Sequence, residues 1–244
     1  MTEEQVKLNQ TALNAILIGK ILPLNVDGDF GALTLAAENL FLALMGKVYK
    51  GKGYISAIEG LHAIRMDDTY TNTFSDWFFC FENYKQIKFF PASTKPGTVA
   101  VWKKAFEWIM GKQGVAVLKE AQILNFWSIQ SAYWSGLRFL LQVIACVIFR
   151  DNNTDGVILR TVEHYGLFGI NGHSWTGWRA LVVSYWKDAI RKIGVALSEG
   201  CQVTVEQYWV IIIEIIIRNN RDNRVDFTLT HFNDFKEIPS VPLA

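Results

Sequence analysis

The chain has 244 residues, a formal net charge of +1, and 50% hydrophobic against 19% charged residues. This composition excludes a disordered protein, and the near-zero net charge gives no electrostatic basis for a nucleic-acid partner. The length allows one large domain or two modest ones, each with a core of its own.

Residues 1–47 are predicted to form a unit of two helices. The first helix has an apolar face made of Val6, Leu13, Ile16 and Leu17. The second helix has apolar residues with i, i+3, i+4, i+7 spacing at Leu33, Ala36, Ala37, Leu40, Phe41, Leu44 and Met45. We expect the second helix to stop at Gly46, because glycine is a common helix terminator.

The loop between these helices carries the pattern D-G-x-F-G-x-x-T, from Asp27 to Thr34. Gly28 permits a tight turn, and Asp29 is placed to accept hydrogen bonds from the first amides of the next helix. The pattern resembles the loop of the small peptidoglycan-binding module. That resemblance implies that Asp27, Asp29 and Phe30 contact the bacterial cell wall. The alternative is a helical hairpin that only docks on the rest of the protein.

Residues 48–73 are predicted to be a linker with one short helix at 54–64, in which His62 is a surface or packing residue. From Phe74 onward, short aromatic and β-branched runs predict a mainly β domain over residues 74–244, so the fold class is α+β. The expected strands cover residues 77–81, 87–90, 114–118, 143–149 and 225–229. Residues 99–110 have helical spacing, and another helix is expected from Val203 with Thr204 as its N-cap.

Asp151, Asn153, Asp155 and Gly156 match the first half of an EF-hand loop. The twelfth position is Val162, where calcium binding needs a bidentate glutamate. We therefore predict a turn between strands at this point, with no metal and no cofactor.

The three cysteines differ in their surroundings. Cys80 and Cys146 lie in apolar runs and are predicted to be inert core thiols. Cys201 lies among polar residues and follows Gly200, in the setting expected of a reachable and ionisable thiol. An odd number of cysteines leaves at least one unpaired, and the spacings fit neither a zinc site nor a redox pair.

Cys201 and His173 form a candidate nucleophile and base. The backbone amides of Gly200 and Cys201 are candidates for an oxyanion hole, and Asn171 or Ser174 is expected to orient the imidazole. His164 is a competing base. A cysteine and a histidine 28 positions apart also occur together by chance, so the pair is interpreted with its glycine-rich context.

The segments Gly-Ile-Asn-Gly-His at 169–173 and Ser-Glu-Gly-Cys-Gln at 198–202 resemble the active-site pair of the L,D-transpeptidase (YkuD-type) cysteine enzymes, closest to their bacteriophage branch. The resemblance covers roughly residues 75–235. Further segments that support it are Phe89 to Thr98, Val147 to Asn153 and Phe227 to Thr230. It implies the L,D-transpeptidase fold, with Trp175, Ser198, Glu199 and Gln202 expected to contact substrate.

By this resemblance the substrate is the stem peptide of bacterial peptidoglycan, and the reaction is hydrolysis or transfer at Cys201. The N-terminus lacks the pattern of a signal peptide, and the apolar run from Tyr208 to Ile217 is interrupted by Glu214 and too short to span a bilayer. We expect synthesis in the cytoplasm and delivery to the cell wall in a phage virion or at lysis. The alternative is an inactive wall-binding or virion structural protein, with other virion proteins as partners, suggested by Ser174 where the phage branch often has arginine.

Overall fold

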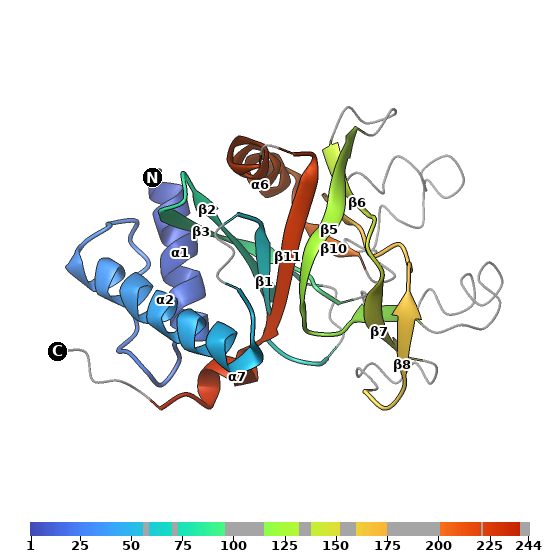
Figure 1. The fold of residues 1–244 in the computed structure, drawn as a ribbon. Coiled ribbons are helices and arrows are strands. Elements are labelled where there is room, and N and C mark those ends of the chain that lie inside the picture. The colour runs from blue at the N-terminus through green and yellow to red at the C-terminus, as the bar shows by residue number, and fades with distance from the viewer. Residues whose placement is uncertain are drawn as a thin grey trace, which may run out of the picture.

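The computed structural model describes residues 1–55, 59–69, 73–95, 115–131, 138–151, 160–174, 201–220 and 222–239. The helices in this part of the chain are α1 (Glu3–Ile16), α2 (Ala32–Lys52), α6 (Glu206–Asn219) and α7 (Phe232–Lys236). The strands are β1 (Leu61–Arg65), β2 (Asp76–Glu82), β3 (Gln86–Ala92), β4 (Val115–Leu118), β5 (Gln122–Ser131), β6 (Arg138–Gln142), β7 (Cys146–Asp151), β8 (Glu163–Gly166), β9 (Gly172–Ser174), β10 (Gln202–Thr204) and β11 (Arg224–His231). Figure 1 shows their arrangement.

The main sheet has the order β10-β9-β6-β5-β11-β1-β2-β3, and a smaller sheet has the order β4-β7-β8. The two ends of the main sheet meet, because the Ser93 amide donates to the Val203 carbonyl at 2.8 Å and the Val203 amide donates to the Ser93 carbonyl at 3.0 Å. Ser93 directly follows β3, and Val203 is the middle residue of β10. The sheet therefore closes into a near-barrel, and the fold is mixed α+β and mostly β, as predicted.

Alternate residues of the strands face the interior of this barrel. Leu61, Phe78 and Phe227 belong to the interior cluster, which also contains Trp209 and Ile212 of α6. The outer face of β2 and β3 contributes Phe79 and Phe89 to a second cluster with α1, α2 and α7. Figure 1 shows these three helices together on one side of the sheet, with α6 apart from them.

The N-terminal helices dock directly on β3. The Asn9 side chain donates to the Ile87 carbonyl at 3.0 Å and accepts from the Phe89 amide at 3.1 Å. The ring of Phe41 lies 5.4 Å from that of Phe79 and 5.1 Å from that of Phe89. The helical unit and the sheet therefore share one core.

Several expected elements are confirmed: α1 and the strands β2, β3, β4, β7 and β11 lie where the patterns placed them. Two others are wrong. Helix α2 continues through Gly46 and ends at Gly53, whose φ of 70° is left-handed. Instead of the expected short helix at 54–64, β1 lies between β11 and β2, with His62 buried and stacked on Phe79.

The helix expected from Val203 starts later. Residues 202–204 form β10, because they pair in parallel with β9, and Val203 also bridges to Ser93. Helix α6 begins at Glu206, and its N-cap is Val205 rather than Thr204. The helical spacing at 99–110 lies outside the described residues.

Helix α2 is long and apolar enough, by length and composition, to cross a membrane. Half of its most apolar window is buried against the rest of the protein. A core helix passes the same test, and the packing of Phe41 on the sheet is that of a core helix.

Candidate active site and loop pocket

Strands β9 and β10 pair in parallel, with Gly172 opposite Gln202 and His173 opposite Val203. The Gln202 amide donates to the Asn171 carbonyl at 2.8 Å, so the pairing extends back to Cys201. Because side chains alternate along a strand, those of Cys201, Val203 and His173 lie on one face. Cys201 and His173 are diagonal neighbours on that face, two positions apart in the register. His173 on β9 and Cys201, the residue directly before β10, are therefore placed by this register at the same end of the strand pair.

The His173 ring has a defined tautomer. Its Nδ1 lies 2.7 Å from the Ser174 carbonyl, which only accepts hydrogen bonds, so Nδ1 carries the proton. Nε2 is then the atom available to accept a proton. Burial lowers the pKa of His173 to about 4, against a smaller opposing effect of the Ser174 hydrogen bond, so the ring is neutral at pH 7.

The orienting group is thus the carbonyl of Ser174. Asn171, the other candidate for this role, is used elsewhere: its Oδ1 accepts from the Gln142 amide at 2.9 Å. The competing base, His164, lies on β8 in the smaller sheet.

The Cys201 thiol is less accessible than its polar sequence context predicts. Its side chain donates to the Gly169 carbonyl at 3.5 Å, and the residue is 5% exposed, while His173 is 7% exposed. Cys80 and Cys146 are buried as predicted, and burial raises the pKa of these thiols to about 12 and about 11. A substrate reaches Cys201 only if neighbouring groups move aside.

Gln202 differs from the prediction that it contacts substrate. It is fully buried and faces the barrel interior, opposite to Cys201. The predicted contacts Trp175, Ser198 and Glu199 and the predicted oxyanion donor Gly200 lie outside the described residues.

A buried polar network next to the barrel closure was not predicted. Asp76 accepts from both the amide and the hydroxyl of Thr94, each at 2.8 Å. Arg65 donates to the Thr94 carbonyl at 3.1 Å and to Glu120 at 2.6 Å. Asp76 and Arg65 are both fully buried. The network fixes Thr94, the residue after Ser93. Because the backbone of Ser93 pairs with Val203, the network also supports β10, the strand that follows Cys201.

Glu120 stays ionised in this network. Burial opposes its charge, but the hydrogen bonds from Arg160 and the charges of Arg65 and Arg160 hold the pKa of Glu120 at about 2. The sequence does carry a signal for this network. Arg65 ends β1 and Asp76 begins β2, so each places a charge at the end of an apolar run.

The predicted wall-binding loop lines a pocket of about 650 Å³. Asp27, Asp29 and Phe30 contribute to it, together with Met1, Glu3, Val6, Gly28 and Gln86. Since Gln86 belongs to β3, the pocket lies where the helical unit meets the sheet.

Gln10, which carries no signal in the sequence, holds this loop. Its side-chain nitrogen donates to Asp27 Oδ1 at 2.9 Å and to the Asp29 carbonyl at 3.0 Å, and its oxygen accepts from the Gly28 amide at 3.1 Å. The predicted capping role of Asp29 is wrong, because the N-cap of α2 is Gly31 and no side chain bonds to it. Hydrogen bonds from the Asp29 amide and from Gln10 lower the pKa of Asp27.

Replacing Gly28 with alanine is expected to lower the free energy of unfolding by about 1–2 kcal/mol or more. Gly28 has a φ of 83°, and an added Cβ would overlap the Glu3 side chain and lie 3.2 Å from the Glu3 carbonyl oxygen. Urea denaturation measures the change. Gly19→Ala is the matched control, because Gly19 has a φ of 75° but open space around it. An equal loss in both variants would contradict the predicted clash.

Among the residues that the structure describes, no group of three or more His, Cys, Asp or Glu side chains could hold a metal ion. Of the EF-hand-like residues, Asp151 ends β7, and Asn153, Asp155 and Gly156 lie outside the described ranges.

The chain matches no protein-family model, and a search of curated proteins finds no significant relative. A functional assignment therefore depends on the geometry of the site and on the resemblance of its two motifs.

Proposed function

We propose that this protein is a cysteine enzyme that cleaves or transfers stem-peptide amides of bacterial peptidoglycan, with the fold of the L,D-transpeptidases. The observation that carries the proposal is the shared face of β9 and β10. There Cys201 is a diagonal neighbour, in the register, of a neutral His173 whose Nε2 is the proton-accepting nitrogen. The resemblance of the two motifs to the phage branch supplies the substrate class.

In this proposal His173 Nε2 takes the thiol proton as Cys201 attacks the peptide carbonyl. The carbon–nitrogen bond breaks, the leaving amine takes the proton from His173, and the acyl group remains on sulfur as a thioester. Water or an acceptor amine then attacks the thioester and regenerates the thiol. The amides of Gly200 and Cys201 remain the predicted oxyanion donors, and the reaction needs no cofactor.

A second candidate function is cell-wall binding without catalysis, by a virion or lysis protein. The loop pocket lined by Asp27, Asp29 and Phe30 favours it, as does the burial of Cys201. Carboxylates that accept hydroxyl hydrogens and an aromatic ring that packs on a sugar face suit a glycan ligand.

Digestion of purified muropeptides, followed by mass spectrometry, tests the enzymatic proposal. Wild-type protein is expected to release a cleaved or cross-linked product, and Cys201→Ala is expected to reduce the rate at least about a thousandfold. Cys146→Ala is the matched control and should retain activity, since Cys146 lies in the other sheet. Absence of product from the wild type would reject the enzyme.

Sedimentation with insoluble peptidoglycan separates the two functions. Binding that is retained by Cys201→Ala but lost in a Phe30→Ala variant, together with no product from the wild type, would establish the binding function in place of the enzyme.

A further inference from the structure

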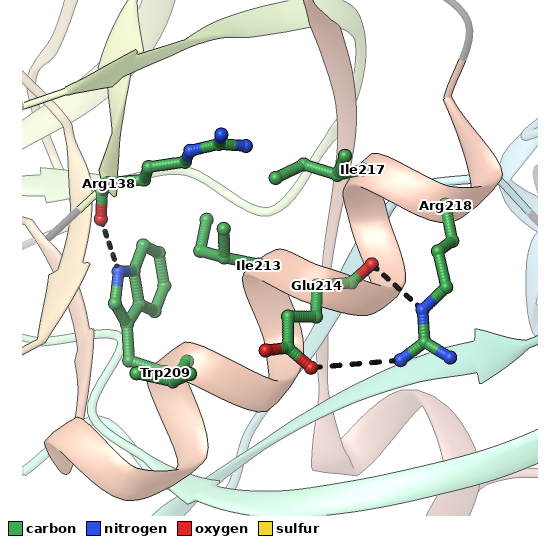
Figure 2. A pocket seen from close by; sticks show the side chains of 7 residues that line it. Arg138, Trp209, Ile213, Glu214, Ile217 and Arg218 are labelled. Atoms are coloured by element: carbon green, nitrogen blue, oxygen red, sulfur yellow. Dashed lines mark hydrogen bonds and ion pairs between the residues drawn. The ribbon is translucent and has the colours of Figure 1, made fainter.

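Helix α6 and the start of β6 line a second, open pocket of about 460 Å³ (Figure 2). Its apolar lining comes from α6 and consists of Trp209, Val210, Ile213 and Ile217. Ligand sites typically have volumes of about 300–1,000 Å³ and a mostly apolar lining with a few polar groups. The pocket has the size and lining of a small-molecule site.

The two arginines that line the pocket, Arg138 and Arg218, differ in their ion-pair partners. Arg218 donates to the Glu214 carbonyl at 3.3 Å and lies 3.4 Å from the carboxylate of Glu82 and 3.9 Å from that of Glu214. The guanidinium of Arg138 makes no hydrogen bond or ion pair with any residue in the described ranges. Figure 2 shows it extending above Ile213 toward Ile217. A planar guanidinium over an apolar lining complements a carboxylate on an apolar body.

The lining of the pocket also favours one kind of carboxylate ligand over another, according to whether its body is a peptide or an alkyl chain. The pocket has no neutral polar side chain, and the α6 backbone bonds within its own helix. The amides of a peptide that lies along Trp209, Ile213 and Ile217 would find no neutral partner there, because the hydrogen-bonding side chains of the lining are the charged Arg138, Glu214 and Arg218. An unbranched alkyl chain carries no such groups. We propose that this pocket binds an aliphatic carboxylate, with its head group on Arg138 and its chain along Trp209, Ile213 and Ile217.

This site is distinct from the proposed catalytic pair and does not depend on its activity. Trp209 nevertheless connects the two. Its ring forms a wall of the pocket, and a Cβ on Gly172 would lie 3.0 Å from its Cη2. Gly172 directly precedes His173 in β9.

Isothermal titration of the full chain with octanoate tests the proposal. We expect saturable binding of one octanoate per chain. The neutral analogue 1-octanol is expected to bind at least about tenfold more weakly, because it loses the charged hydrogen bonds to Arg138. N-acetyl-alanyl-leucine, a carboxylate with a peptide body, should also bind more weakly than octanoate. Tighter binding of the dipeptide, or no saturable binding of octanoate, would overturn the proposal.

Two variants locate the site. Arg138→Met keeps the length of the side chain, removes its charge and is expected to weaken octanoate binding at least about tenfold without changing the binding of 1-octanol. Val210→Glu adds a negative charge at a residue that is 39% exposed and should also weaken octanoate binding. The control Arg224→Met changes an exposed arginine that does not line the pocket and should bind as the wild type does. Circular dichroism checks that each variant is folded. Equal octanoate affinity in Arg138→Met and wild type would contradict the assignment.

Discussion

Replacing Trp209 with alanine is expected to lower the free energy of unfolding by about 3–5 kcal/mol. Trp209 is 1% exposed, belongs to the interior cluster and donates from its indole nitrogen to the Arg138 carbonyl at 2.7 Å. The substitution leaves a cavity beside Gly172 and a carbonyl without its partner. Urea denaturation followed by circular dichroism measures the loss.

Two controls separate the contributions of Trp209. Trp209→Phe keeps an aromatic ring but loses the indole donor, so it should cost less than the alanine variant. Val210→Ala changes the next residue, which is 39% exposed, and should lower the free energy of unfolding much less than Trp209→Ala does. A loss below about 1 kcal/mol in Trp209→Ala would show that the barrel does not depend on this contact.

Acid is expected to destabilise the protein through His173. Burial lowers the pKa of this imidazole from 6.5 to about 4, so between these values the unfolded chain binds a proton that the folded chain does not. The stability that the lowered pKa of His173 contributes is fully present above pH 6.5 and is lost as the pH falls toward 4. The difference in pKa corresponds to roughly 3 kcal/mol. Urea denaturation at a series of pH values measures the slope.

The variant His173→Gln isolates this titration from the others. It removes the ionisable group, and the fall in stability between pH 6.5 and 4 should be smaller than in the wild type by about that amount. The buried carboxylate Glu120 has its pKa lowered to about 2, so its own contribution is lost at lower pH, as the pH falls from 4.5 toward 2. A wild-type slope retained in His173→Gln would exclude His173 as the source.

The local pattern of the sequence predicted α1, β2, β3, β4, β7 and β11, and α2 and α6 with other ends, because alternation and helical spacing are set by nearby residues. It did not predict β5, β6, β8, β9 or β10. It also predicted that Cys201 and His173 belong to one site, which stays a prediction; His173 lies on β9, and Cys201 directly precedes β10, the strand paired with β9. The strand β1 was missed, because its short segment lies near glycines and becomes a strand only by pairing with β11 and β2. That pairing joins segments far apart in the chain.

The burial of Cys201 and the network around Asp76 were missed for a related reason. Polar neighbours in the sequence predicted a reachable thiol, but the thiol packs with Val203 and Phe74, and Phe74 comes from a distant segment. Arg65 and Glu120 are polar residues whose buried pairing depends on the closed sheet. Contacts of this kind are properties of the three-dimensional arrangement, and no periodicity encodes them.

The parallel pairing of β1 with β11 has a consequence for biosynthesis. The strand β11 is synthesised after β1–β3 and β5–β6, and it separates β1 from β5 in the finished sheet. A nascent chain that lacks β11 has no strand between β1 and β5, so the barrel stays open there with unpaired strand edges and an exposed apolar interior. The barrel can therefore be completed only after β11 has been synthesised, and until then the growing polypeptide exposes aromatic strands that chaperones can bind.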